Sequence, residues 1–120
     1  MENILNLTQH ACSAEQAAAG VVEPADKRAV QTALTFTEMP TKEIISARAN
    51  ALAEIASQSD CKKAMIGGAP YLMSALEKAL KDKDIAPVYS FSERVSKEVV
   101  REDGTTEKTS VFQHKGFIEV

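Results

Sequence analysis

The residues whose types and spacing have the clearest chemical potential are Ile66-Gly67-Gly68-Ala69-Pro70. Two glycines directly after an apolar run let the backbone turn sharply and approach a ligand without a Cβ in the way. Proline at the first helical position gives up an N–H that would be unsatisfied anyway, and the remaining N–H groups can face an anion. The junction predicts a phosphate-binding turn lined by Gly67, Gly68, Ala69 and Pro70. The alternative is a tight strand-to-helix turn that binds nothing, since the motif is shorter than a P-loop or a dinucleotide fingerprint.

Thr8, Gln9 and His10 form a second group of candidate ligand-binding residues, at the end of the first apolar run. Ligands in open α/β sheets gather at the carboxyl ends of the strands, so this group should stand beside the glycine junction. Its hydroxyl, amide and imidazole groups could bond phosphate oxygens or the edge of a base. The alternative is that polar residues simply follow where a strand reaches water.

Ser92 and Arg94 follow the third candidate strand and complete the expected ligand-binding set. Arg94 could hold a phosphate through two parallel hydrogen bonds. It could equally pair with Glu93 or Glu98 on the surface, and the sequence does not decide between these roles.

Acid–base chemistry without a metal is the reaction type that these residues could support, with His10 and Arg94 as the candidate catalytic residues. His114 is the only other histidine, and a pair of histidines can move a proton through phosphodiester cleavage. Nothing in the sequence shows that His10 and His114 meet. There is no HExxH motif, Walker motif, Ser–His–Asp signature or cluster of metal-ligating residues, so we expect neither a metal nor a cofactor.

Composition limits the class of protein. The 120 residues, 44% apolar and 26% charged, predict one domain over residues 1–120. A net charge of −3 argues against binding of long nucleic acid, which needs a broad basic surface. Cys12 and Cys61 show no zinc-ligand spacing and are interpreted as reduced thiols. With no leader and no apolar stretch of roughly 20 residues, we expect a cytoplasmic protein that makes no membrane contact.

The elements that must position these residues alternate between strands and helices. Ser13 and Gln16 have the spacing of a capping box, Gly20 ends a short helix, and Asp103-Gly104 is a strong hairpin signal. This order predicts an α/β fold, a small Rossmann-like three-layer sheet that is mostly parallel, with a C-terminal antiparallel hairpin. The hairpin at 97–108 is either a solvated ribbon or a dimer arm. We expect strands at 3–8, 21–22, 64–66, 87–91, 95–101, 107–114 and 116–120, and helices at 13–19, 24–35 with Pro24 in the first turn, 41–57 and 71–83.

The opening Leu5-Asn6-Leu7-Thr8-Gln9-His10, followed by Ser13-Ala14-Glu15-Gln16, resembles the start of small stand-alone CRISPR-associated Rossmann-type (CARF-like) proteins. The short strand, glycine- or proline-containing turn and helix of that group are matched by residues 64–83, and a closing strand pair follows. The chain departs from the group in having Gly-Gly-Ala-Pro at the turn and a long hairpin near the C-terminus.

The resemblance implies a homodimer that binds cyclic oligoadenylates, the second messengers of type III CRISPR antiviral defence, across its two-fold axis. Several members of the group are ring nucleases, in which the ribose 2′-hydroxyl attacks its own phosphate without a metal. Degradation of a cyclic oligonucleotide is therefore the first functional hypothesis. The alternatives are a non-catalytic sponge or sensor in defence or counter-defence, and a scaffold or phage accessory protein whose Gly-Gly turn is structural.

Overall fold

The structure is a computed structural model that describes residues 3–120, apart from the side chain of Lys97. Within that part a five-stranded sheet has the order β2-β1-β3-β4-β5. The first four strands run parallel and β5 runs antiparallel to β4. This confirms a mostly parallel α/β sheet with an antiparallel C-terminal pair. The elements are β1 (Ile4–Leu7), α1 (Ala14–Ala18), β2 (Val21–Val22), α2 (Lys27–Leu34), α3 (Lys42–Ser57), β3 (Lys63–Ile66), α4 (Pro70–Lys81), β4 (Ala86–Val100) and β5 (Thr106–Glu119).

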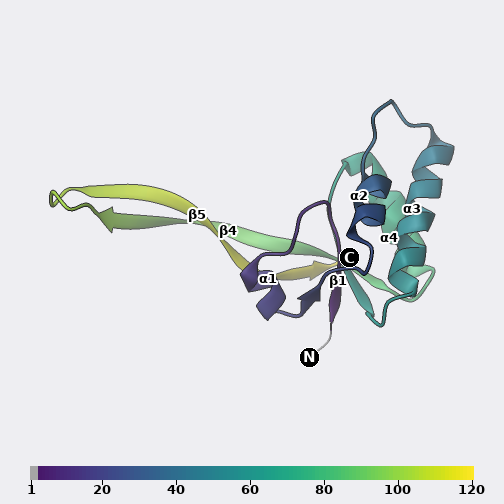
Figure 1. Cartoon of the computed structure of the whole chain (residues 1–120), viewed down its shortest axis with the longest axis horizontal. Coiled ribbons are helices and arrows are strands. Elements are labelled where there is room, and N and C mark those ends of the chain that lie inside the picture. Colours follow the sequence, from purple (N-terminus) through teal and green to yellow (C-terminus); the bar gives the residue numbers. More distant parts are fainter. Residues whose placement is uncertain (1–2) are drawn as a thin grey trace.

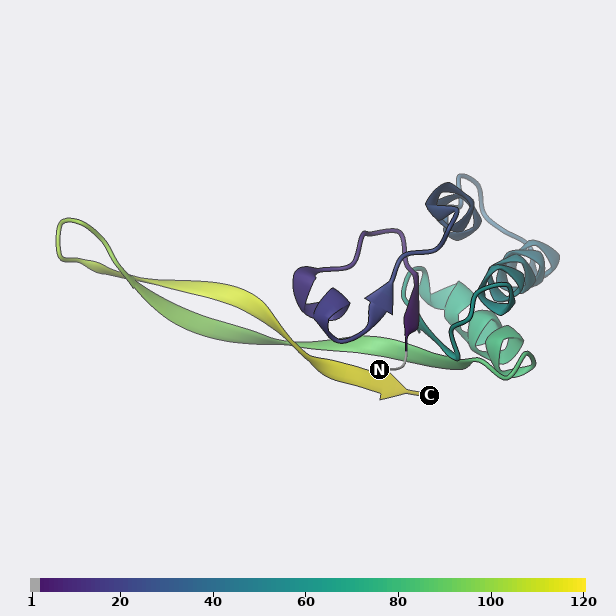
Figure 2. The same cartoon turned by 60° about the horizontal axis from the view of Figure 1, so that its bottom comes forward.

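The two faces of the sheet are covered unequally. Side chains alternate along a strand, so Leu5 and Leu7 of β1 face one way and Ile4 the other. The first face packs into the main core with α2, α3 and α4, whereas the second carries a cluster of four buried residues. Figures 1 and 2 show α2–α4 gathered on one side of the molecule and the short α1 apart from them.

Local signals explain where the helices begin. Thr41 caps α3 by accepting a hydrogen bond from the backbone N–H of Ile44. The expected position of Pro24 in the first turn of α2 is wrong. The carboxylate of Asp26 accepts from the backbone of Ala29, so the helix starts at Lys27 and Pro24 lies ahead of it.

Strands β4 and β5 extend well beyond the rest of the sheet. The separate strands expected at 87–91 and 95–101 are one continuous strand of 15 residues. A register shift between Phe91 and Ser92 marks a bulge, which bends the pair without ending it. Only Ala86–Val88 pairs with β3, so residues 92–114 form a two-stranded ribbon, which we call the arm. The arm gives the molecule its longest dimension, 58 Å (Figure 1).

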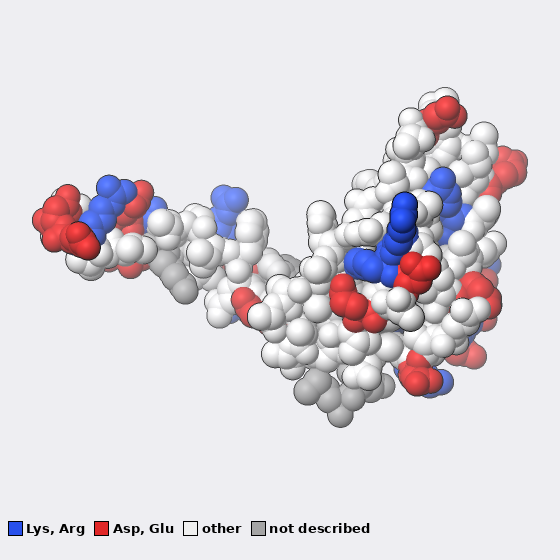
Figure 3. Space-filling view, viewed as in Figure 1, with Lys and Arg blue, Asp and Glu red and all other residues white. Residues whose placement is uncertain are grey.

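The tip of the arm turns at Asp103-Gly104, where the sequence predicts a hairpin, and Gly104 has a positive φ of 86°. Charged side chains of both signs gather at this tip, whereas much of the arm nearer the sheet is uncharged on the face seen in Figure 3. Among the helices of the described residues, none has the length and apolar character needed to cross a membrane.

Candidate functional site

The ends of β1 and β3 and the neighbouring part of β4 line a cavity at the carboxyl edge of the parallel strands. Leu7 pairs with Ile66, and Met65 pairs with Val88. The residues that follow Leu7, Ile66 and Val88 in the three strands therefore lie side by side. We call the resulting space, about 540 Å³, the strand-end cavity. It is lined by Thr8, Gln9, His10, Ala11, Ser13, Gln16, Met65, Ile66, Gly67, Gly68, Tyr89 and Ser90.

Most of the residues that the sequence analysis singled out come together here. Thr8, Gln9, His10, Gly67 and Gly68 all line the strand-end cavity. The junction continues with Ala69, which is the N-cap of α4, and Pro70, which is the first residue of that helix.

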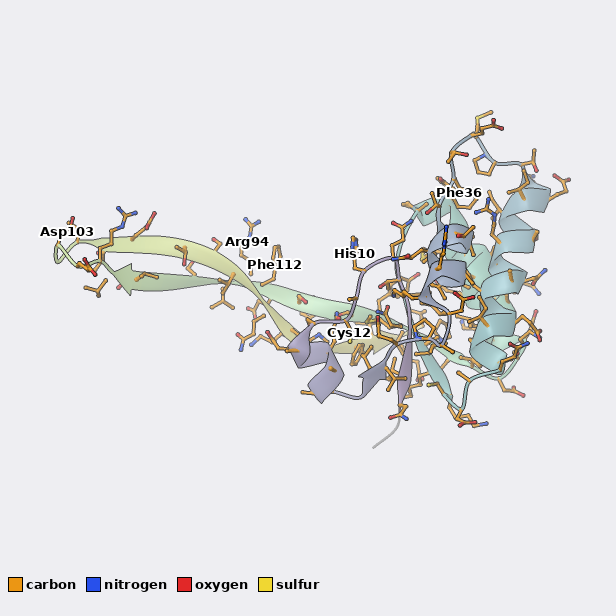
Figure 4. The ribbon with its side chains drawn as sticks, in the orientation of Figure 1. His10, Cys12, Phe36, Arg94, Asp103 and Phe112 are labelled. Atoms are coloured by element: carbon orange, nitrogen blue, oxygen red, sulfur yellow. The ribbon has the colours of Figure 1, made fainter. Side chains whose placement is uncertain are left out.

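Ser92 and Arg94 do not line the cavity, because the bulged strand carries them onto the arm. The guanidinium of Arg94 lies 5.3 Å from the ring centroid of Phe112. Figure 4 shows this pair on the arm, to the left of His10. The alternative role for Arg94, an ion pair with Glu93 or Glu98, is also not formed among the described residues, and Glu93 is 3.6 Å from the amine of Lys115.

The loop that carries Thr8 and His10 is held by a buried polar side chain. Asn6 is fully buried, and its carbonyl oxygen accepts from the backbone and hydroxyl of Thr8 at 3.0 and 2.6 Å. Its amide donates to the carbonyl of His10 and to the carboxylate of Glu23. The amine of Lys27 donates to the carbonyls of Thr8 and His10 at 2.7 and 3.0 Å. This polar cluster fixes the rim of the cavity.

Sequence reasoning missed Asn6 and Lys27 as supporting residues. The available signal was an asparagine inside an otherwise apolar strand, since a buried amide needs hydrogen-bond partners. Gln9 has a structural role, because its amide donates to the hydroxyl of Thr35 at 3.0 Å and so ties the loop to the end of α2. The ring of His10 is exposed and rises from the loop toward solvent (Figure 4).

The two glycines of the junction have different roles. Gly68 has a positive φ of 151°, and a Cβ there would contact Met73 and Leu34 of the core at 3.6 and 3.7 Å. Gly67 has no such φ, and a Cβ there would lie 3.7 Å from the methyl of Thr8, at the cavity. The turn therefore requires glycine at position 68, whereas glycine at position 67 leaves space for a ligand.

A second hydrogen-bonded chain joins α1 to β4 and β5. The predicted capping box is confirmed, since Gln16 accepts from the backbone N–H of Ser13 and Ser13 accepts from that of Gln16. The amide of Gln16 also donates to the hydroxyl of Ser90 at 3.2 Å. That hydroxyl lies 3.1 Å from Nδ1 of His114. His10 therefore lines the strand-end cavity itself, whereas His114 lies behind Ser90.

Tyr89 lines the cavity and also packs against the main core. Its hydroxyl donates to a carboxylate oxygen of Glu77 at 2.6 Å. The pKa of Tyr89 is raised from 10.0 to about 12. Burial is the largest cause, and the hydrogen bond to Glu77 is the next. This side chain is therefore a neutral, packed wall of the cavity.

Within residues 3–120, no group of three or more His, Cys, Asp or Glu residues is arranged to hold a metal ion. Cys12 and Cys61 are free thiols.

The family model described as "Uncharacterized protein MJ1673 family" matches residues 2–118. The chain belongs to this family. The matched residues include both the strand-end cavity and the whole arm. No curated protein and no solved structure matches the chain.

Proposed function

We propose that the chain binds a cyclic oligonucleotide second messenger, a cyclic oligoadenylate, in the strand-end cavity and degrades it by metal-independent phosphodiester cleavage. The observation that carries the proposal is the cavity itself, where the Gly67-Gly68 turn meets the end of β1 and the side of β4. In this interpretation the fold is a small Rossmann-like domain whose third layer is α1. The protein would act in the cytoplasm, in CRISPR-linked antiviral defence or counter-defence.

The start of α4 supports binding of a phosphate. Ala69 provides no side-chain cap, and Pro70 has no N–H. The N–H of Leu72 donates to the carbonyl of Ala69 at 3.0 Å, which leaves the N–H of Tyr71 without a side-chain acceptor. Such an N–H group, together with the helix dipole, favours an anion. The small Gly67 leaves space for that anion beside Thr8. Phosphate would bind at this corner, and Tyr89 would form a wall for a base or ribose.

A cyclic oligoadenylate needs more space than one cavity offers. A volume of 540 Å³ suits a small molecule and would hold only part of the ring. A homodimer with two such cavities across a two-fold axis would hold the whole ring. The arm supports this arrangement, because a two-stranded ribbon is marginally stable alone and this one exposes Val100 and Phe112. We place Ser92 and Arg94 of each arm at the partner's ligand, where Arg94 would bind phosphate.

Cleavage would use the ligand's own 2′-hydroxyl as the nucleophile. Arg94 from the partner would stabilise the charge that develops on the phosphate, and His10 would assist proton transfer. One observation favours the alternative, a sponge or sensor without chemistry. The exposed ring of His10 makes no hydrogen bond to the described residues, whereas a catalytic base is usually oriented by a second group.

The test is incubation of the purified protein with cyclic tri-, tetra- or hexa-adenylate in EDTA, followed by chromatography of bound and free nucleotide. Linear products would support cleavage, and intact ligand that co-elutes with the protein would support a sponge or sensor. Failure to bind all three would rule out the proposed ligand class. Arg94→Ala should weaken binding about tenfold or more, as expected for loss of a charged phosphate contact. Ser96→Ala, on the same strand, is the control.

A further inference from the structure

We propose that Ser90 and His114 form a proton relay that takes the proton from the attacking hydroxyl of the ligand. The inference rests on the proposed function and adds the group that accepts the proton. Ser90 lines the strand-end cavity, and His114 lies directly behind it on β5. The sequence motifs assign Ser90 no catalytic role and suggest His114 only as a partner of His10, whereas the structure brings His114 to Ser90.

The relay uses the tautomer of His114 in which Nδ1 is unprotonated, and the hydrogen bonds around Ser90 are compatible with it. The amide nitrogen of Gln16 can only donate, so the hydroxyl oxygen of Ser90 accepts at 3.2 Å. The hydroxyl proton of Ser90 is then free to point at Nδ1 of His114, 3.1 Å away. In that arrangement Nδ1 is unprotonated and ready to accept, and Ser90 keeps a second lone pair for a hydroxyl group in the cavity.

Contacts with α1 and β5 position His114. Its backbone N–H donates to a carboxylate oxygen of Glu15 at 3.0 Å, which brings a negative charge from α1 beside the residue. Its ring lies 4.8 Å from the ring of Phe117, which restrains it. The neighbouring cation, Lys115, is paired with Glu93 of β4. These contacts hold the residue in place behind Ser90.

The step is balanced in protons and electrons. The 2′-hydroxyl of the ligand gives its proton to the oxygen of Ser90 while the proton of Ser90 moves to Nδ1 of His114. The 2′-oxygen forms a bond to phosphorus, and the bond between phosphorus and the 5′-oxygen breaks. The 5′-oxygen keeps the electron pair and takes a proton from water, and the imidazolium returns its proton to the hydroxide left behind. The products are a 2′,3′-cyclic phosphate and a 5′-hydroxyl.

The relay is better organised than a mechanism based on His10. The ring of His10 is exposed, whereas Ser90 and His114 are half-buried and joined to each other and to Gln16. Because proton transfer depends on hydrogen-bond reach, the organised pair is the stronger candidate for the base.

The experiment measures binding and single-turnover cleavage of the cyclic oligoadenylate that the wild type cuts, in EDTA, across a range of pH. Ser90→Ala and His114→Gln should bind within about threefold of the wild type but cleave about 100-fold more slowly, as expected for loss of a general base. The ionisation that controls the wild-type rate should disappear in His114→Gln. Ser96→Ala, an exposed serine farther along β4, should match the wild type. Thermal unfolding checks that each variant folds, and Ser90→Ala removes a single oxygen should His114→Gln fail to fold.

The outcomes separate this inference from the proposed function. Wild-type cleavage rates and pH profiles in both variants would overturn the relay and leave the proposed function standing. Equal losses of binding and cleavage would make the pair a ligand-binding contact and also overturn the relay. A wild type that binds without cutting overturns the relay but keeps the nucleotide site. A wild type that neither binds nor cuts overturns both.

Discussion

The arm and the rest of the molecule use apolar residues in opposite ways. In the body, which comprises residues 3–91 and 115–120, Leu72 and Leu76 of α4 are fully buried against the sheet. On the arm, Val100 and Phe112 are 71% and 69% exposed. Both regions are continuous through β4, so one strand passes from a packed core into a ribbon that is open to water.

The difference in the exposure of apolar residues indicates that the body and the arm are stabilised by different interactions. The body gains its stability from burial, which contributes roughly 25 cal/mol per Å² of apolar surface. The arm relies on its cross-strand ladder and on side-chain pairs such as Arg94 with Phe112. Since the exposed apolar residues of the arm do little for the fold of one chain, they fit the contact with a second copy that we propose.

The largest expected effect comes from a matched truncation in the two regions. Leu76→Ala should lower the free energy of unfolding by about 2–5 kcal/mol, because it opens a cavity in the core. Phe112→Ala should cost less than about 1 kcal/mol at a concentration where the protein is monomeric. Chemical denaturation of both variants measures the difference. Equal losses would mean that the arm is packed as tightly as the body, which would contradict the comparison.

Local sequence signals predicted caps and turns better than the extent of the strands. The capping box at Ser13 and the turn at Gly67-Gly68 depend on neighbours in the chain, and both are present. The continuity of β4 was missed because no local sequence pattern shows that the strand continues through the bulge at Phe91 and Ser92. Its consequence is that Arg94 lies on the arm, not beside the cavity.

The supporting residues of the cavity could not be predicted for a related reason. Asn6 and Lys27 act together only because α2 packs beside the end of β1, which no local spacing encodes. The contact between Ser90 and His114 depends on the register of β4 with β5, which the same bulge sets. Sequence therefore identified the strand ends that form the site, whereas tertiary register determined which side chains meet there.

A second comparison lies within the glycine turn of the body. Gly68→Ala should destabilise the fold by about 1–2 kcal/mol, since its φ of 151° is unfavourable for a residue with a Cβ. Gly67→Ala should change stability by less than about 0.5 kcal/mol, because its Cβ meets only ordinary contacts. The added methyl nevertheless occupies the space that we assign to the ligand, so Gly67→Ala should weaken nucleotide binding.

Thermal unfolding and nucleotide binding measured on the same two proteins test this pair. A stable Gly67→Ala protein with wild-type binding would place the phosphate elsewhere in the cavity. Loss of stability in Gly67→Ala alone would show that the roles assigned to the two glycines are reversed.

The smallest expected effect compares a polar pair in the body with one on the arm. Tyr89→Phe removes the hydrogen bond to Glu77 and should cost about 1 kcal/mol at neutral pH. The pair of Arg101 and Glu107 near the tip of the arm is exposed, so Arg101→Gln should cost between about 0 and 1 kcal/mol, and less at high salt.

The dependence on pH distinguishes the two pairs more sharply than the magnitudes do. The pKa of Tyr89 is raised in the folded state from 10.0 to about 12, so folding favours the protonated hydroxyl. Its contribution is fully present below pH 10 and is lost as the pH rises from 10 through about 12. Tyr89→Phe should therefore flatten the fall in stability over that window, measured by denaturation at several pH values, whereas Arg101→Gln should leave it unchanged. If the stability of Tyr89→Phe falls between pH 10 and about 12 as much as that of the wild type, another group in the body causes the fall.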